Sequence, residues 1–251
     1  MKLHYNELGE GSPVIILHGF LGSSDNWLPI GKTLSEKHEV YLVDQRNHGL
    51  SPHSSDHNYH LLAHDLHDFI HEHGIADPVL LGHSMGGKTV MHFASLFPDA
   101  FKKLIIADIA PRFYPARHTR ILEGLLSIDL SSIQSRNEAD EQLAKYVKEE
   151  SIRMFLLKNL GRKEGGFTWK ANLPVLQENL DQIGQAITGE NITRKPVFFI
   201  KGNNSDYITP EDGETIRKMF PTAKILGIKN AGHWLHAEQR EAFLNVLASI
   251  L

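Results

Sequence analysis

The sequence predicts an α/β fold, in which a mostly parallel sheet is flanked by helices and interrupted by one inserted helical segment. Short runs of Val, Ile and Leu recur along the chain, and most are separated by stretches with helical periodicity, as buried parallel strands alternating with helices are. Most runs also end in a polar or glycine-containing turn. The runs lie at 14–17, 40–43, 79–81, 104–106, 197–200 and 224–228.

The alternation of strands and helices breaks once, which divides the chain into a core and an insertion. Residues 1–110 and 191–251 carry the strand runs and form the predicted core domain. Residues 111–190 contain no buried-strand run, and capping signals place one helix near 137–149 and another after Asn172. We therefore expect residues 111–190 to form a helical lid (cap) over the core.

Composition excludes several classes of function. The 251 residues carry a formal net charge of -4 with both signs mixed, so no basic stripe is present to bind nucleic acid. The chain has no cysteine, which removes disulfides, thiolate metal sites and a cysteine nucleophile. No segment approaches the ~18 apolar residues of a membrane span, and no signal-peptide pattern follows Met1. We expect a cytoplasmic protein with no membrane partner.

Ser84 is the candidate nucleophile. It stands in Gly82-His83-Ser84-Met85-Gly86, which fits G-x-S-x-G between a predicted strand and a predicted helix. A sharp strand-to-helix turn holds a serine in a strained conformation, and the flanking glycines allow the two elements to approach. The pattern predicts a nucleophile elbow.

His233 is the candidate base. A serine hydroxyl is a weak nucleophile until a base takes its proton. His233 follows the last predicted strand, which gives the chain order Ser, acid, His that this kind of elbow uses. The alternative base is His236, three residues later. We expect a surface or hydrogen-bonding role for His236 instead.

Two backbone N–H groups are the candidate oxyanion donors, because the tetrahedral intermediate of acyl transfer needs donors that are already in place. The N–H of Met85 directly follows the nucleophile. The second donor is the N–H of Phe20, in the glycine-rich turn at residues 18–22 after the first long strand. An ordinary glycine turn is the alternative interpretation of that loop.

These motifs together resemble the α/β-hydrolase family. Within it, the chain is most similar to the YbfF-type esterases and their mitochondrial abhydrolase relatives. The lid segment at residues 167–173 contributes to this resemblance. The resemblance implies an α/β-hydrolase fold, hydrolysis of carboxylic esters or acyl thioesters without a cofactor, and the site roles given above. The motifs are His18-Gly19-Phe20-Leu21-Gly22-Ser23, Asp44-Gln45-Arg46-Asn47-His48-Gly49-Leu50-Ser51, Gly82-His83-Ser84-Met85-Gly86-Gly87-Lys88, Asp108-Ile109-Ala110-Pro111 and Ala231-Gly232-His233-Trp234.

The acid of the triad has two candidates, Asp108 and Asp206. Both follow a predicted buried strand between Ser84 and His233, so chain order does not separate them. Asp206 lies one residue beyond the usual position, which Ser205 occupies, and successive residues of an extended segment face opposite ways. In the YbfF-type subgroup the matching aspartate serves with a serine. We expect Asp108 as the acid, with Ser205 as its hydrogen-bonding partner and Asp206 as the alternative.

An apolar acyl pocket is expected under the lid, because such sites are lined mainly by apolar and aromatic side chains. Packing of the lid itself is the alternative role for each candidate. The candidate lining residues are Leu21, Phe113, Tyr114, Trp169 and Trp234.

Two further constellations are interpreted as structural. Four histidines recur at helical spacing on a predicted helix at about 59–73, opposite its apolar face, so we expect a solvated face and no metal site. Asp44 and Arg46 precede Ser84 in the chain, and we expect a loop-stabilising ion pair between them. The histidines are His60, His64, His67 and His71.

The leading functional hypothesis is a carboxylesterase-type serine hydrolase that acts on a small-molecule ester or thioester. A non-catalytic ligand-binding or interaction protein on the same fold is one alternative, which the intact Ser84 and His233 disfavour. A C–C bond hydrolase with the same triad is another. Acyl-chain length, the leaving group, stereoselectivity, the physiological role and the oligomeric state stay open at this stage.

Overall fold

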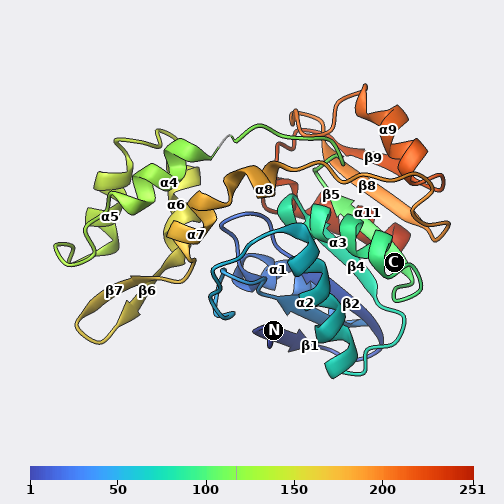
Figure 1. The fold of residues 1–251 in the computed structure, drawn as a ribbon, viewed down its shortest axis with the longest axis horizontal. Helices are drawn as coiled ribbons and strands as arrows, with labels where there is room; N and C mark the ends of the chain where they lie inside the picture. The colour runs from blue at the N-terminus through green and yellow to red at the C-terminus, as the bar shows by residue number, and fades with distance from the viewer. Residues whose placement is uncertain (117) are drawn as a thin grey trace.

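A seven-stranded sheet forms the centre of the computed structural model, which describes residues 1–116 and 118–251 (Figure 1). The strand order is β1-β3-β2-β4-β5-β8-β9, and every neighbouring pair is parallel except β1 with β3. All six predicted strand runs lie in this sheet. The strands are β1 (Tyr5–Leu8), β2 (Ser12–Leu17), β3 (His38–Val43), β4 (Val79–His83), β5 (Lys103–Ala107), β8 (Val197–Gly202) and β9 (Lys224–Ile228).

Helices cover both faces of the sheet, and alternate strand residues pack against each layer. In β2, Ile15 and Leu17 belong to the cluster shared with α2, α3 and α9, whereas Val14 and Ile16 belong to the cluster shared with α1 and α11. The helices of the core are α1 (Leu28–Leu34), α2 (Tyr59–Glu72), α3 (Met85–Leu96), α9 (Asp212–Met219), α10 (Leu235–Glu238) and α11 (Arg240–Ile250), with a short 3₁₀ helix at Ser24–Trp27.

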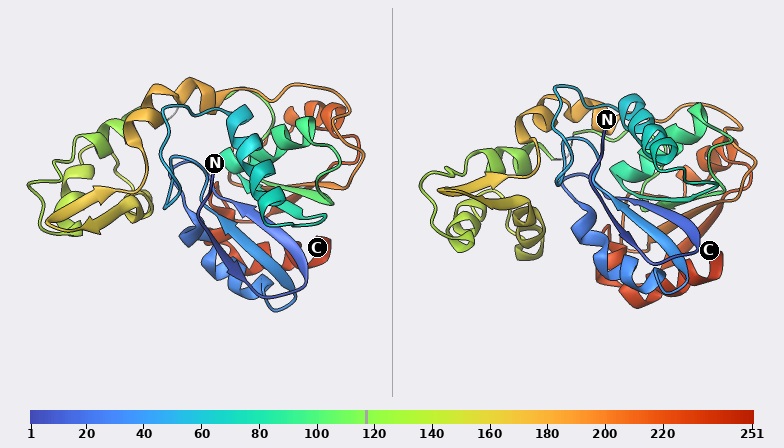
Figure 2. Two further views of the ribbon diagram at one scale, coloured as in Figure 1. Left: turned by 60° about the horizontal axis from the view of Figure 1, so that its bottom comes forward. Right: turned by 90° about the horizontal axis from the view of Figure 1, so that it is seen from below.

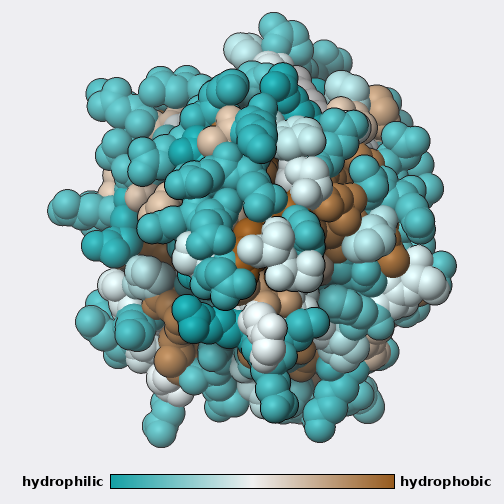
Figure 3. All heavy atoms as spheres, turned by 90° about the vertical axis from the view of Figure 1, so that its left-hand side faces the viewer, coloured by the Kyte–Doolittle hydropathy of each residue, from teal (hydrophilic) through white to brown (hydrophobic). Residues whose placement is uncertain are grey.

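Between β5 and β8 the chain leaves the sheet and forms the insertion, which stands beside the sheet in both views of Figure 2. Its outer side carries mostly hydrophilic side chains, with hydrophobic ones showing in patches between them (Figure 3). The elements of the insertion are α4 (Thr119–Leu126), α5 (Arg136–Leu143), α6 (Glu150–Leu156), a 3₁₀ turn η2 (Leu157–Asn159), β6 (Leu160–Lys163), β7 (Gly166–Trp169), α7 (Leu173–Glu178) and α8 (Leu180–Gly184).

The structure corrects the expected secondary structure of the insertion at two points. The helix expected near 137–149 ends at Leu143, and the chain continues in turns. A two-stranded antiparallel hairpin, β6 with β7, lies where only helices were expected. Its register pairs Leu160 with Trp169, and its strands are too short and too exposed to produce a buried-strand run.

The parallel strands bring the candidate site residues to one edge of the sheet. Loops that follow the carboxyl ends of parallel strands meet at the same edge, which is where such sheets bind ligands. Phe20 follows β2, Ser84 follows β4, and Asp108 follows β5. Ser205 follows β8 and His233 follows β9, so five separate loops converge there.

Candidate active site

Ser84 lies at the sharp turn between β4 and α3, with a left-handed backbone conformation of φ 51° and ψ -115°. Its N–H donates to the carbonyl oxygen of Ala107 at 3.0 Å, and its own carbonyl accepts from the N–H of Lys88 at 3.1 Å. A non-glycine residue in such a conformation costs of order 1–3 kcal/mol and persists only where its surroundings fix it. The neighbouring strand and the first helical turn provide that fixation here.

The glycines of the elbow permit this turn because no side chain fits at either position. A Cβ atom on Gly82 would lie 2.1 Å from the carbonyl oxygen of Gly86. A Cβ on Gly86 would lie 2.5 Å from the carbonyl oxygen of Leu17 in β2. The motif therefore reflects close packing of β4, α3 and β2 backbones around Ser84.

His233 and Asp108 meet at the same edge. Nδ1 of His233 donates to Oδ2 of Asp108 at 2.9 Å, since a carboxylate only accepts. The Asp108 side chain is fully buried, and it also accepts from the N–H of Gly202 at 2.9 Å and from the hydroxyl of Ser205. Because the proton of the neutral His233 ring is on Nδ1, its Nε2 is unprotonated and can accept a proton.

The structure brings Asp108 to His233 and leaves Asp206 at the surface. Asp206 is exposed, and its main-chain carbonyl accepts from Nη2 of Arg112 at 3.1 Å. Ser205, one residue earlier, points its hydroxyl at Asp108 and accepts from the N–H of Tyr207 at 3.2 Å. The two residues thus face opposite ways after β8.

Aromatic contacts hold the His233 ring in place, and His236 lies in a different environment. The His233 ring stacks on Tyr207 with centroids 3.7 Å apart. The main-chain carbonyl of His233 accepts a hydrogen bond from Nε2 of His83 at 2.8 Å. His236 is buried and stacks on Trp27 at 4.2 Å. Burial, with smaller effects of the charges of His233 and Lys158, lowers the pKa of His236 to about 3.

The loop that carries Phe20 approaches Ser84 closely. A Cβ on Gly19 would lie 2.8 Å from Nδ1 of His83 and 3.2 Å from Cβ of Ser84, so a side chain at that position would displace the His83 ring. The turn closes with a bond from the N–H of Gly22 to the carbonyl of Gly19 at 2.9 Å. Met85 is the first residue of α3, and N–H groups of a first helical turn have no partner within their helix. Both candidate oxyanion donors therefore lie beside Ser84, Phe20 in the loop after β2 and Met85 at the start of α3.

Buried polar side chains support this loop, and the sequence analysis assigned them no role although His18 and Gln45 stand in its motifs. Nε2 of His18 accepts from the N–H of Gln45 at 3.0 Å, while Nδ1 donates to the carbonyl of Gly19 at 2.8 Å. Burial lowers the pKa of His18, which favours this neutral form. The Gln45 amide donates to the carbonyl of His18 at 2.7 Å and accepts from the hydroxyl of Thr89 at 2.8 Å.

A cavity of about 220 Å³ opens over Ser84 and His233. Leu21 and Trp234, two of the expected lining residues, do line it. The insertion contributes an apolar wall, which sequence reasoning missed because the helix periodicity of α4 and α6 does not say which face meets the core. The apolar residues of that wall are Ile121, Ile152, Phe155 and Leu156, and His118, which precedes α4, also lines the cavity.

Phe113 and Trp169 are corrections to the expected pocket. The structure places neither in the lining of the cavity over Ser84. Phe113 is 55% exposed, and Trp169, in hairpin strand β7, is partly buried and packs against the hydrophobic core. Tyr114 lines a smaller cavity of about 40 Å³ that Ser84 also lines, together with Lys88 and Tyr59.

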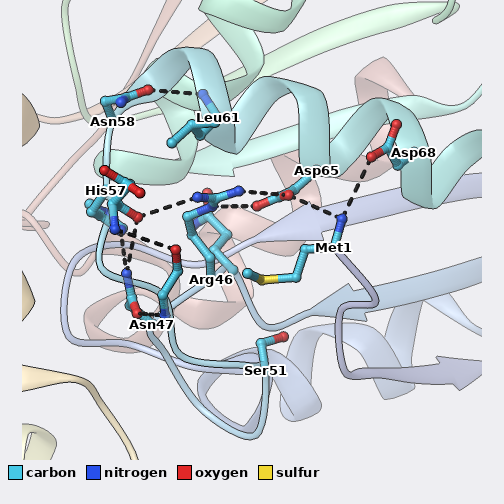
Figure 4. A network of polar contacts seen from close by, with 12 residues as sticks. Met1, Arg46, Asn47, Ser51, His57, Asn58, Leu61, Asp65 and Asp68 are labelled. Atoms are coloured by element: carbon cyan, nitrogen blue, oxygen red, sulfur yellow. Dashed lines mark hydrogen bonds and ion pairs between the residues drawn. The ribbon is translucent and has the colours of Figure 1, made fainter.

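The expected ion pair between Asp44 and Arg46 is wrong, because each binds another partner. Arg46 forms a two-pronged pair with Asp65 of α2, at 2.5 and 2.9 Å (Figure 4). Asp44 accepts from the N–H groups of Ser24 at 2.6 Å and Leu50 at 2.8 Å. Both side chains are buried in the loop scaffold.

Helix α2 spans Tyr59–Glu72, close to the range expected for it. Its four histidines lie on the exposed side of the helix: His60, His64, His67 and His71. The rings of His64 and His67 contact Phe97 with centroid distances of 5.3 and 4.0 Å. Within residues 1–116 and 118–251, no group of three or more His, Asp or Glu side chains is placed to hold a metal ion. Among those same residues, no helix has the length and apolar character needed to cross a membrane.

The fold and this arrangement of residues define the α/β-hydrolase class. The sequence matches the alpha/beta hydrolase fold family over residues 12–239, and the chain belongs to this family. The predicted resemblance is therefore confirmed.

Three relatives show where the chain stands within the family. It is 36% identical over 243 residues to "Esterase YbfF" of Escherichia coli, with 96% of this chain and 93% of that protein covered. It is also 36% identical over 262 residues to mouse "sn-1-specific diacylglycerol lipase ABHD11", with 100% and 85% covered. A solved structure titled "Marine microorganism esterase" superposes with a TM-score of 0.97 at 45% identity and covers 100% of this chain and 99% of that one.

Proposed function

We propose that this protein hydrolyses carboxylic esters through an acyl-enzyme on Ser84, with His233 as base and Asp108 as the acid that orients it. The family and the esterase-named and lipase-named relatives establish a carboxylesterase-type hydrolase. The observation that supports the assignment of roles is the bond between His233 Nδ1 and Asp108 at 2.9 Å, beside a cavity that Ser84 and His233 both line.

In the acylation step, Nε2 of His233 takes the proton of the Ser84 hydroxyl as the oxygen attacks the ester carbon. The carbonyl oxygen becomes an oxyanion, which the N–H groups of Phe20 and Met85 stabilise. The protonated His233 then gives its proton to the leaving alcohol or thiol, and the C–O or C–S bond breaks. Asp108 stabilises the imidazolium throughout without taking the proton.

In the second step, water hydrolyses the acyl-enzyme by the same route. His233 takes a proton from the water as its oxygen attacks the acyl carbon, and then returns the proton to Ser84. The products are the carboxylic acid and the free serine. No cofactor enters either step.

We also propose that residues 111–190 act as a lid that sets substrate preference. This proposal is supported by the apolar wall that α4 and α6 contribute to the cavity over Ser84. A cavity of about 220 Å³ suits small to medium acyl or alcohol groups. Location in the cytoplasm stays a prediction from the sequence.

The test compares the wild-type protein with Ser84→Ala. Initial rates on p-nitrophenyl esters of graded chain length and on an acyl-CoA panel give the substrate class, and fluorophosphonate labelling reports the nucleophile. We expect Ser84→Ala to lose labelling and nearly all hydrolysis, leaving at most the ~10³-fold rate over water that binding and the oxyanion hole supply. Full labelling of the variant would contradict the assignment.

A further inference from the structure

The peptide groups around Leu21, in the loop that carries the Phe20 oxyanion donor, are held from two sides. The N–H of Leu21 donates to Nε2 of His48 at 3.2 Å. The carbonyl oxygen of Leu21 accepts from Nδ2 of Asn159 at 2.7 Å. His48 belongs to the core, whereas Asn159 belongs to the insertion, and both side chains are buried.

Leu21 needs such restraint because its φ is 56°, in the left-handed region. For a leucine this conformation costs roughly 1–2 kcal/mol relative to the ordinary regions. The Leu21 N–H belongs to the peptide group that joins Phe20 to Leu21. Fixing this group restrains the Cα of Phe20 and, through the φ and ψ of Phe20, the direction of the Phe20 N–H. Loss of either hydrogen bond therefore frees the loop to relax away from the geometry that Ser84 requires.

His48 is built as a neutral acceptor for this bond. Its Nδ1 donates to the carbonyl oxygen of Arg46 at 3.0 Å, since a carbonyl only accepts, and Nε2 therefore carries the lone pair that Leu21 uses. Burial and the nearby rings of His18 and His57 keep the pKa of His48 well below its usual value. The imidazole thus presents one fixed tautomer.

The loop that carries His48 is itself fixed at several points (Figure 4). The Arg46 guanidinium is clamped on Asp65, and the Asn47 side chain accepts from the N–H of Ser54 at 2.8 Å. The insertion adds two bonds: the N–H of Asn172 donates to the Asn47 carbonyl at 2.9 Å, and the Asn172 amide donates to the Asn47 side chain at 3.1 Å.

Asn159 is equally well fixed on the insertion side. Its amide nitrogen also donates to the carbonyl of Leu156 at 3.1 Å, and its own carbonyl oxygen accepts from the N–H of Lys170 at 2.8 Å. These bonds tie it to the end of α6 and to the residue after the β6-β7 hairpin. The insertion therefore reaches the oxyanion loop through a rigid side chain.

We propose that His48 and Asn159 are positioning residues of the oxyanion hole, which hold Leu21 so that the Phe20 N–H is aimed at the reacting carbonyl. This inference rests on the proposed function. It gives the insertion a second role beside that of a pocket wall, since one half of the clamp comes from it. Donors that act on the oxyanion strengthen in the transition state, so the clamp contributes to kcat more than to substrate binding.

The test uses two pairs of matched variants. In His48→Gln the side-chain oxygen can occupy the place of Nε2 and accept from Leu21, whereas in His48→Asn the shorter side chain keeps only the donor to Arg46. Asn159→Asp removes the donor to Leu21. Asn179→Asp is its control, because Asn179 donates to the carbonyl of Val175 at 2.8 Å within the insertion and lines neither cavity beside Ser84.

Three quantities are measured for each variant: kcat and KM on one p-nitrophenyl ester, and the inhibition constant of a trifluoromethyl ketone whose adduct with the serine is an oxyanion. Active-site concentration comes from end-point fluorophosphonate labelling, so that partly unfolded preparations still give rates per active site. Removing one oxyanion donor outright costs about 10²- to 10³-fold in kcat. We expect His48→Asn and Asn159→Asp to lose about tenfold or more, with KM nearly unchanged and ketone affinity falling in proportion.

His48→Gln and Asn179→Asp should stay close to the wild-type values of kcat and ketone affinity. Unchanged ketone affinity in both His48→Asn and Asn159→Asp, or an equal loss in Asn179→Asp, would overturn the inference. Failure of the proposed function gives a different result, since the wild-type protein would then neither hydrolyse the ester nor take the label.

Discussion

Asp108 and His233 are separated by 125 positions in the chain, yet a carboxylate oxygen of Asp108 lies 2.9 Å from Nδ1 of His233. The pair forms because β5 and β9 are parallel strands of one sheet whose carboxyl ends lie at the same edge. Asp108 has a φ of 50°, so its backbone turns sharply directly after β5 and keeps the carboxylate buried beneath the imidazole.

The first prediction compares the two aspartates. Asp108→Asn should lower kcat by at least about 100-fold, because an acid that orients the imidazole and stabilises its charged form contributes as much as ~10⁴-fold. Asp206→Asn should stay within about tenfold of the wild-type value, since Asp206 is exposed and its main-chain carbonyl, which accepts from Arg112, is unchanged by the substitution. Steady-state rates on one ester decide it. A severe Asp206→Asn with a mild Asp108→Asn would reverse the assignment.

The second prediction concerns Ser205, whose hydroxyl donates to the carboxylate oxygen of Asp108 that also binds His233. Ser205→Ala removes one hydrogen bond to a charged group, which is typically worth ~1.5–3 kcal/mol. We expect kcat to fall about tenfold, because the bond from Gly202 still holds the carboxylate. Ser205→Thr keeps a hydroxyl and should recover most of the rate. Equal losses in the two variants would show that the hydroxyl has no part in the effect.

Most of the sheet could be predicted from the sequence, because parallel strands buried on both faces produce continuous apolar runs. Strand β1 was missed for the opposite reason. It is an antiparallel edge strand with the sequence Tyr-Asn-Glu-Leu at residues 5–8, and its partly exposed residues give no such run. Chain order and loop position also sufficed to propose Ser84 and His233 as the reacting pair.

The parts of the site that escaped prediction depend on tertiary packing. Arg46 lies two residues from Asp44, yet its partner is Asp65 on a helix that packs beside the loop. The lining residues Ile152 and Phe155 reach the cavity only because of how α6 docks on the core. Polar supports such as Asn159 stand in no motif, since their role follows from one hydrogen bond across the molecule.

The third prediction concerns the apolar wall of the cavity. Phe155 lines it beside Trp234, with ring centroids 5.9 Å apart. Phe155→Ala should shift the preference toward longer chains, because the removed ring leaves space that a longer apolar group fills. Met154→Ala on the same helix is the control, since Met154 is 64% exposed. Rates over a series of p-nitrophenyl esters decide it; a uniform loss at every chain length would point to a folding defect.

A buried lysine one turn after the nucleophile provides the last prediction. Nζ of Lys88 donates to the carbonyls of Arg112 at 2.9 Å, Gly184 at 3.1 Å and Gln185, which join the two ends of the insertion to α3. The ring of Tyr114 lies 4.8 Å away. Burial, with a smaller effect of the Arg112 charge, lowers the pKa of Lys88 to about 7 from its ordinary 10.5.

A lowered pKa means that the unfolded chain binds the Lys88 proton more tightly than the folded protein does, so folding stability gains as pH rises between the two pKa values. We expect the free energy of unfolding of the wild-type protein, relative to Lys88→Met, to increase from about pH 7 to about pH 10, by at most about 1.4 kcal/mol per pH unit. Urea unfolding over that range measures it. Lys218→Met is the control, because Lys218 is 64% exposed and pairs with Glu190, which raises its pKa. The difference between the wild-type protein and this control should stay flat over the same range. A flat difference for Lys88→Met as well would mean that its three carbonyl acceptors keep the ammonium charged despite burial, with no proton released on folding.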